Sequence, residues 1–288
     1  MKVYGNFTQA ELDEAFNARG TAPDFDAVLR RYDEDSARVR ARFTGKLGVA
    51  FGPSADETLD IFPAERPDAP IQLFIHGGYW RLLTRTENSF AAEALVPAGA
   101  TVVVINYALA PRVTLDEIVR QCRASIAWTW KNARSFGADP DRLFISGHSA
   151  GGHLVGMMLA TDWERDFGVP PDVVKGATAV SGLYDLRPVR KSFVNEWLKL
   201  DEAGAVRNNP LLNLPKRGCP LIMSYGERDT PEFRRQSDEY LAAWRAKGHP
   251  GVYVDMPGFH HFDVMNEIAN PASALARAVF RQMGLGGR

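Results

Sequence analysis

Residues 142–152 read RLFISGHSAGG, an apolar run that leads into the pattern G-x-S-x-G. The residues before Gly147 predict a strand, and the apolar residues after Gly151 predict a helix directly behind it. Because glycine lacks a Cβ atom, these two positions suit a sharp turn from strand to helix. Such a turn presents the Ser149 hydroxyl at a helix N-terminus, where the helix dipole favours negative charge. We therefore predict that Ser149 is a nucleophile rather than a residue of an ordinary glycine-rich loop.

Strand-like and helix-like segments alternate from residue 46 onward. Uninterrupted apolar runs such as 102–105 predict strands that are covered on both faces, as in parallel sheets. Longer segments with apolar residues at helical spacing lie between them. This alternation favours a mostly parallel α/β sheet with helices on both faces. We expect strands at 46–51, 58–62, 71–75, 101–106, 142–146, 174–180, 220–225 and 252–256, and helices near 86–97, 114–135, 149–161, 231–247 and 271–283.

Two segments fall outside the alternation. Residues 1–45 read as helical and polar. Residues 183–218 interrupt the pattern between two late strands, with a short helix expected around 191–203. We expect these two segments to form a small cap over one edge of the sheet. Because no linker separates them from the alternating part, residues 1–288 are interpreted as a single domain.

The charge balance and the cysteine content exclude several classes of protein. The 288 residues include 34 basic and 35 acidic side chains, so no net positive charge attracts nucleic acid or an anionic membrane. Cys122 and Cys219 cannot form a disulfide framework, and no zinc-binding cluster is evident. No apolar stretch reaches the roughly 18 residues of a membrane span, and the N-terminus lacks the apolar core of a signal peptide. We expect a soluble, cytoplasmic protein.

A second motif, HGGYW at 76–80, directly follows an expected strand. Two adjacent glycines let the backbone approach a substrate carbonyl oxygen closely, and a loop in this position supplies N–H groups to an oxyanion hole. Ala150, the residue after the predicted nucleophile, supplies a further N–H group in such sites. His76 is interpreted as a structural support of the loop. Trp80 and His148 are candidates for the substrate pocket, with core packing as the alternative for Trp80.

A nucleophilic serine needs an acid and a base, which follow it along the chain in that order in this kind of site. Asp229 and Glu227 come just after a late strand, and we prefer Asp229 as the acid. His260 and His261 come after the next strand. Spacing alone does not decide which of the two histidines is the base.

These motifs resemble those of the kynurenine formamidases (arylformamidases), serine hydrolases of the α/β-hydrolase fold that are related to hormone-sensitive-lipase-like esterases. The resemblance rests on HGGYW at 76–80, GHSAGG at 147–152 and DTPEFRRQS at 229–237, and it extends to LDEAFNAR at 12–19. It implies an α/β-hydrolase fold for most of the chain, and it places the family's acid at Asp229.

The resemblance also implies a base and an oxyanion hole. The family's base directly precedes a phenylalanine in an Asp-His-Phe-Glu pattern, which here reads HHFD at 260–263. The base is then His261, and the histidine before it replaces the family's acidic residue. By analogy with the related esterases, the N–H groups of Gly78, Tyr79 and Ala150 form the oxyanion hole.

The implied reaction is hydrolysis of an aryl formamide, N-formyl-L-kynurenine to L-kynurenine and formate, through an acyl-enzyme on Ser149. The expected partner is a small-molecule substrate. We expect no metal, no cofactor, and no binding to nucleic acid or membrane. Exposed apolar helices are compatible with a homodimer. A short-chain carboxylesterase and an amidase for another N-acyl metabolite are the alternatives, because the three catalytic side chains do not distinguish between leaving groups. A non-catalytic binding protein on this fold is expected to lack one of the three, and all are present.

Overall fold

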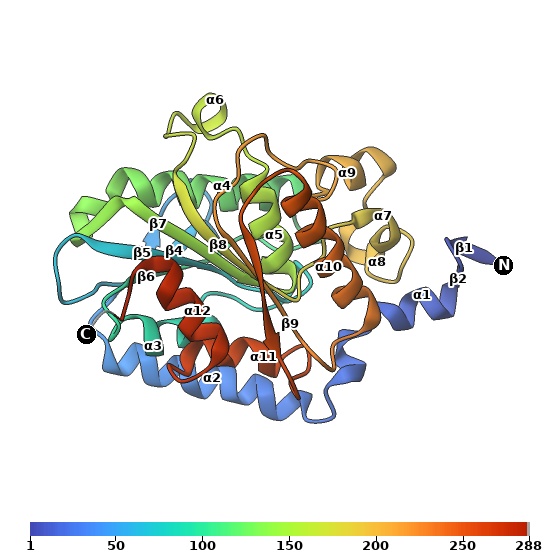
Figure 1. The fold of residues 1–288 in the computed structure, drawn as a ribbon, viewed down its shortest axis with the longest axis horizontal. Coiled ribbons are helices and arrows are strands. Elements are labelled where there is room, and N and C mark those ends of the chain that lie inside the picture. Colours follow the sequence, from blue (N-terminus) through green and yellow to red (C-terminus); the bar gives the residue numbers. More distant parts are fainter. Residues whose placement is uncertain (287–288) are drawn as a thin grey trace.

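An eight-stranded sheet forms the centre of the computed structural model, which describes residues 1–286 (Figure 1). The strand order is β10-β9-β8-β7-β5-β6-β4-β3. The strands are β3 (Lys46–Ala50), β4 (Thr58–Phe62), β5 (Ala69–Ile75), β6 (Thr101–Ile105), β7 (Ala138–His148), β8 (Val174–Val180), β9 (Leu221–Gly226) and β10 (Gly251–Met256). β5 to β10 pair in parallel, whereas β4 joins β6 and β3 in antiparallel fashion. The predicted mostly parallel α/β sheet is confirmed.

Helices cover both faces of this sheet (Figure 1). One face carries α4 (Leu115–Asn132), α5 (Ala150–Leu159) and α10 (Pro231–Ala246), and the other carries α2 (Phe25–Arg42), α3 (Ala92–Leu95) and α12 (Ala274–Met283). The two layers explain the apolar run in β6. Val103 and Ile105 belong to the core of the first face, and Val102 and Val104 belong to the core of the second. A strand covered on both sides needs an apolar residue at every position.

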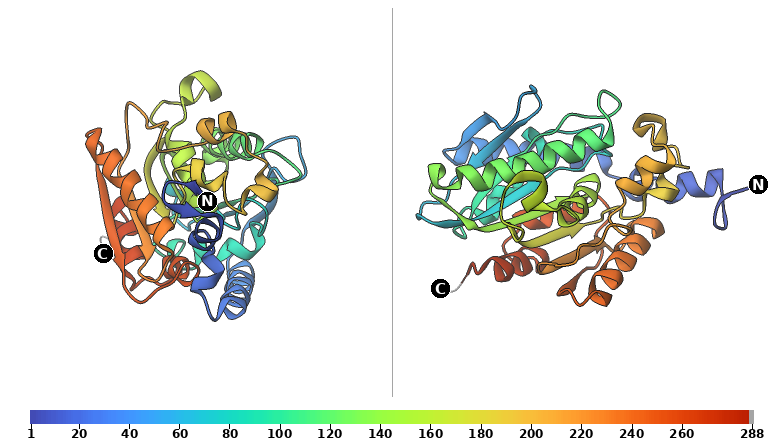
Figure 2. Two further views of the ribbon diagram at one scale, coloured as in Figure 1. Left: turned by 90° about the vertical axis from the view of Figure 1, so that its right-hand side faces the viewer. Right: turned by 90° about the horizontal axis from the view of Figure 1, so that it is seen from above.

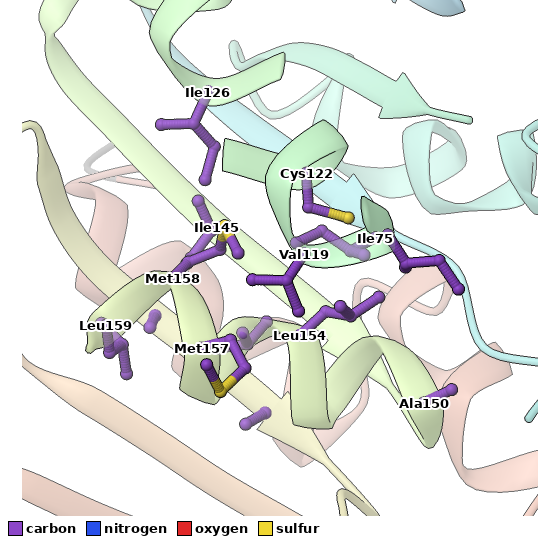
Figure 3. Packing of buried hydrophobic residues seen from close by; sticks show 14 of the residues in the cluster. Ile75, Val119, Cys122, Ile126, Ile145, Ala150, Leu154, Met157, Met158 and Leu159 are labelled. Atoms are coloured by element: carbon purple, nitrogen blue, oxygen red, sulfur yellow. The ribbon is translucent and has the colours of Figure 1, made fainter. Parts of the chain in front are cut away.

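α5 begins directly after Ser149 and is buried along its whole length. Figure 3 shows its apolar side chains lying among Val119 and Cys122 of α4 and Ile145 of β7, all of them members of one buried cluster. Close-packed interiors of this kind resist displacement. The residue that precedes α5 is therefore held on a rigid support.

Some local predictions are wrong. Residues 2–8 form a hairpin of β1 (Lys2–Tyr4) and β2 (Phe7–Thr8), not a helix, because Gly5 with φ of +50° turns the chain. The helix predicted near 86–97 is a 3₁₀ turn at Thr86–Ala91 followed by α3. There the Asn88 side chain donates to the Thr84 carbonyl, a local bond that competes with regular helix. α6 (Trp163–Phe167) was not predicted.

The two segments outside the alternation meet at one end of the molecule, where α1 (Gln9–Ala15) lies with the short helices of residues 183–218 (Figure 2). These are α7 (Leu186–Val189), α8 (Asn195–Leu198) and α9 (Glu202–Arg207), in place of the one helix expected around 191–203. Three hydrogen bonds join the segments: Gln9 Nε2 donates to the Lys191 carbonyl at 2.9 Å, Phe193 N donates to Asp13 at 2.7 Å, and the Tyr4 hydroxyl donates to Asp185 at 3.3 Å. We call these elements the cap. Among residues 1–286, no helix combines the length and the apolar character that crossing a membrane requires.

Candidate active site

Ser149 lies at the turn between β7 and α5, with φ of 57° and ψ of −119°. A side chain at either flanking glycine would clash with backbone. A Cβ atom on Gly151 would lie 2.1 Å from the Ile75 carbonyl oxygen, and one on Gly147 would lie 2.4 Å from the Gly151 oxygen. The chain can make this turn only with glycine at both positions, which is the physical content of the G-x-S-x-G pattern.

The predicted acid, Asp229, contacts the predicted base, His261, and His261 also contacts Ser149. His261 Nδ1 lies 3.1 Å and 3.0 Å from the two carboxylate oxygens of Asp229, and His261 Nε2 lies 3.0 Å from Ser149 Oγ. A carboxylate only accepts, so Nδ1 carries the imidazole proton and Nε2 is free to accept from the Ser149 hydroxyl. Glu227, the other acid candidate, is exposed and accepts from Gly258 N instead.

The structure separates the two neighbouring histidines. His260 does not contact Ser149: its Nε2 lies 2.9 Å from Asp24 Oδ1, near the start of α2. His261 is held from behind by His148, whose Nε2–H donates to the His261 carbonyl oxygen at 2.7 Å. Burial, together with the nearby His261, keeps the pKa of His148 well below its usual value. His148 is therefore a neutral imidazole that holds the backbone of His261, and its place in the substrate pocket stays a prediction.

The HGGYW loop lies against the serine turn, because a Cβ atom on Gly77 would be 3.2 Å from Ser149 Cβ. Gly78, Tyr79 and Trp80 all have positive φ, at 99°, 50° and 59°. Within residues 1–286, the N–H groups of Gly78 and Tyr79 donate to no protein acceptor, and neither does that of Ala150. Three unused donors beside the serine are what a developing oxyanion requires.

Other residues of the loop pack inward. Trp80 is fully buried, and its indole N–H donates to His153 Nδ1 at 3.2 Å. In this conformation Trp80 packs in the core, as the alternative interpretation expected, and does not line an open pocket. His76 stacks on Tyr107 at 4.1 Å between ring centres, and its Nδ1 contacts the Gly77 carbonyl at 2.8 Å. Burial lowers the pKa of both His76 and His153 to about 4. Both histidines are therefore neutral structural groups near neutral pH.

An aromatic cluster surrounds the Tyr79 ring, and the sequence did not reveal it. Phe193, Trp197 and Phe233 lie between 6.0 and 6.3 Å from Tyr79, measured between ring centres. The Phe233 ring also lies 4.5 Å from the His261 ring. Two of the four residues come from the cap, and only their place in the interrupted segment 183–218 hinted at the site. Ser149 is 4% exposed beneath this cover.

Comparisons with known proteins identify the family of this chain. Residues 72–264 match a family model that is described as "alpha/beta hydrolase fold". The kynurenine formamidase of Danio rerio is 34% identical over an alignment of 297 residues, which covers 99% of each chain. This chain belongs to the kynurenine formamidase family. As a member of that family of α/β-hydrolases, it is a hydrolase.

Other relatives of this kynurenine formamidase family member include esterases. Esterase LipQ of Mycobacterium tuberculosis is 28% identical, with 75% of this chain and 57% of LipQ covered. A solved structure from Silicibacter sp. TM1040, provisionally described as a thioesterase, has a TM-score of 0.80 at 26% identity and covers 93% of this chain and 98% of its own. The Pyrobaculum calidifontis esterase has a TM-score of 0.72 at 18% identity, with 95% and 98% covered, and shares the fold. Within residues 1–286, no cluster of three or more His, Cys, Asp or Glu side chains is arranged to hold a metal ion.

Proposed function

We propose that this chain is a serine hydrolase that cleaves aryl formamides, with N-formyl-L-kynurenine as its substrate. The observation that carries the proposal is the continuous hydrogen-bonded series from Asp229 through His261 to Ser149, in a member of the kynurenine formamidase family. In this series a buried carboxylate orients an imidazole, and the imidazole faces a hydroxyl at a helix N-terminus.

In the first half-reaction, Ser149 Oγ attacks the formyl carbon and its proton passes to His261 Nε2. Negative charge develops on the formyl oxygen, where the free N–H groups of Gly78, Tyr79 and Ala150 stabilise it; loss of one such donor typically slows a reaction by about 10²–10³-fold. Asp229 stabilises the imidazolium that forms. The C–N bond then breaks, the aryl amine leaves with the proton from His261, and formyl-Ser149 remains.

In the second half-reaction, water attacks the formyl carbon and gives a proton to His261. The ester bond to Ser149 Oγ breaks, formate leaves, and the hydroxyl recovers its proton from His261. The sum is one amide bond and one water consumed, with one amine and one formic acid produced, and the acid ionises to formate and a proton. The formyl group has no carbon substituent, which suits a serine covered as closely as Ser149.

The aromatic cluster supports an aryl leaving group. The Phe233 ring neighbours both the Tyr79 and the His261 rings, and Phe193 and Trp197 also neighbour the Tyr79 ring. Offset and edge-on contacts with a substrate ring contribute about 0.5–1.5 kcal/mol beyond area burial. The aryl amine, which leaves the formyl carbon with a proton from His261, thus departs beside aromatic side chains.

The experiment is a direct comparison of N-formyl-L-kynurenine with p-nitrophenyl acetate as substrates, measured as formate and acetate release. We expect a higher kcat/KM for the formamide, and in Ser149→Ala and His261→Ala a loss of about 10⁴-fold or more in kcat. Each variant should retain the wild-type circular dichroism spectrum. Turnover in Ser149→Ala at the wild-type rate contradicts the mechanism.

A short-chain carboxylesterase is the second candidate, because esterases such as LipQ are relatives of the chain. The same side chains would act on an ester, with an alcohol in place of the amine. Preference for p-nitrophenyl acetate in the comparison above, with Ser149 still required, assigns this function instead. It would leave the mechanism on Ser149 unchanged and replace only the substrate.

A further inference from the structure

His260 stands beside the predicted base and makes two kinds of contact. On its own loop, His260 Nδ1 accepts from the backbone N–H groups of Phe262 and Asp263 at 3.1 and 3.3 Å. Because Nδ1 is occupied as an acceptor, we assign the imidazole proton to Nε2. Nε2–H then donates to Asp24 Oδ1 at 2.9 Å, across 236 positions of the sequence.

The Asp24 side chain contacts His260 and does not cap α2. Asp24 precedes α2 at the N-cap position, where aspartate side chains commonly accept from the first helical N–H groups. Here the Asp24 side chain makes no capping hydrogen bond. A break in a local rule of this kind is expected where another contact takes precedence.

Further side chains of α2 hold the same turn. The buried Tyr32 hydroxyl donates to the Phe262 carbonyl oxygen at 2.6 Å, and the Phe25 ring lies edge-on to the Phe262 ring at 4.8 Å. His261 therefore lies between two residues, His260 and Phe262, that are both bound to α2. Its own side chain must meet Ser149 and Asp229 at the same time.

We propose that His260 and Asp24 are a positioning pair, through which the start of α2 fixes the turn 260–263 and thereby aims His261 at Ser149. An acidic residue at 260, as the family resemblance expects, could accept from the loop N–H groups but could not donate to Asp24. The His260–Asp24 hydrogen bond therefore links the N-terminal segment to the turn that carries His261. The inference rests on the proposed role of His261.

The test compares Asp24→Ala with Asp24→Asn, since an asparagine oxygen can still accept from His260 Nε2–H. The first readout is the rate at which a fluorophosphonate bonds to Ser149 Oγ with loss of fluoride, which requires the base but no particular substrate. The second is kcat and KM for p-nitrophenyl acetate. Asp26→Ala is the matched control. The Asp26 carboxylate is 76% exposed, and its ion pair with Arg19 is long, at 3.7 Å.

We expect Asp24→Ala to lower both the labelling rate and kcat about tenfold with KM unchanged, since small misplacements of catalytic groups are costly. Asp24→Asn should restore both values to within about twofold of wild type, and Asp26→Ala should match wild type. Equal losses in Asp24→Ala and Asp24→Asn overturn the proposal, as does a wild-type rate in Asp24→Ala.

A second variant keeps the test independent of Asp24 substitutions. In His260→Asn the amide oxygen replaces Nδ1 as the acceptor for the loop, but the shorter side chain does not reach Asp24. We expect the same loss as in Asp24→Ala, with no further loss when the two are combined. Additive losses overturn the pairing. His261→Ala separates the two ideas: if it labels as fast as wild type, the proposed function fails at its base, whatever the Asp24 variants do.

Discussion

Ser149 occupies a backbone conformation that its own side chain disfavours. A non-glycine residue with positive φ costs about 1–3 kcal/mol and persists only where the surroundings impose it. Here the Ser149 N–H donates to the Val180 carbonyl at 2.9 Å, and the Ser149 carbonyl accepts from His153 N at 3.1 Å, so β8 and α5 hold the peptide on both sides. The strain at this residue is the consequence of presenting its hydroxyl to His261.

Replacement of the serine should therefore separate activity from stability. Ser149→Ala and Ser149→Gly both remove the proposed nucleophile, but only glycine adopts this φ without strain. We expect Ser149→Gly to be more stable than Ser149→Ala by about 1 kcal/mol, measured as the free energy of unfolding in urea. Equal stability of the two variants would show that the turn is unstrained.

At the scale of elements, the HGGYW loop depends on partners from elsewhere in the chain. Carbonyl groups of the loop accept from residues elsewhere in the chain: Tyr107 donates to that of His76, Trp197 Nε1 donates to that of Tyr79 at 2.9 Å, and Ala110 N donates to that of Trp80 at 2.8 Å. A peptide group joins each carbonyl to the N–H of the next residue, so the N–H groups of Gly78 and Tyr79 are held through the carbonyls of Gly77 and Gly78. Those two carbonyls accept from groups close by, His76 Nδ1 at 2.8 Å and Leu82 N at 2.9 Å. Trp197 of α8 holds the next peptide, between Tyr79 and Trp80, so the cap restrains the loop one residue beyond the proposed oxyanion donors.

Trp197→Phe tests this restraint, because it keeps an aromatic ring in the cap and removes the indole donor. A neutral hydrogen bond contributes about 1 kcal/mol, so we expect kcat for p-nitrophenyl acetate to fall about fivefold. Trp163→Phe, in α6 at the far end of α5, is the control and should leave kcat unchanged. If the two variants lower kcat equally, the cap does not order the loop.

Local patterns explain which elements could be predicted. Strands such as β6 are apolar at every position because they are covered on both sides, and α4 and α10 carry clear apolar stripes. The cap helices are as short as four residues and lack any such periodicity. Their positions are set by tertiary contacts such as Gln9 with Lys191, which a local pattern does not contain.

At the scale of the whole molecule, the parallel topology explains why the site could be anticipated. Ser149, Asp229 and His261 follow β7, β9 and β10, whose carboxyl ends lie at one edge of one sheet. Chain order therefore favoured Asp229 and limited the histidine to His260 or His261, and the family resemblance selected His261. Neither predicted the tie between Asp24 and His260, or the aromatic cluster around Tyr79, because residues far apart in the sequence form both without a motif.

Buried neutral histidines make the stability of the whole molecule depend on pH. The pKa of His76 and that of His153 are about 4 in the folded chain, because burial disfavours the charged form, and that of His148 is also well below its usual value. In the unfolded chain a histidine titrates near 6.5. Between about pH 6.5 and 4, the unfolded chain therefore binds more protons than the folded one, and acid favours unfolding.

We expect the free energy of unfolding to be independent of these groups above about pH 6.5 and to fall as the pH drops towards about 4. Each fully titrating histidine adds up to about 1.4 kcal/mol per pH unit to the slope. Urea unfolding at several pH values measures the slope of the unfolding free energy against pH. His153→Gln should reduce this slope by the contribution of about one histidine. His153 accepts from Trp80 at Nδ1 and contacts the Asn208 carbonyl at Nε2, so a proton added at Nδ1 must break the first contact inside the core. A slope that is the same in His153→Gln and wild type would mean that the folded chain accepts this proton without opening, which its complete burial argues against.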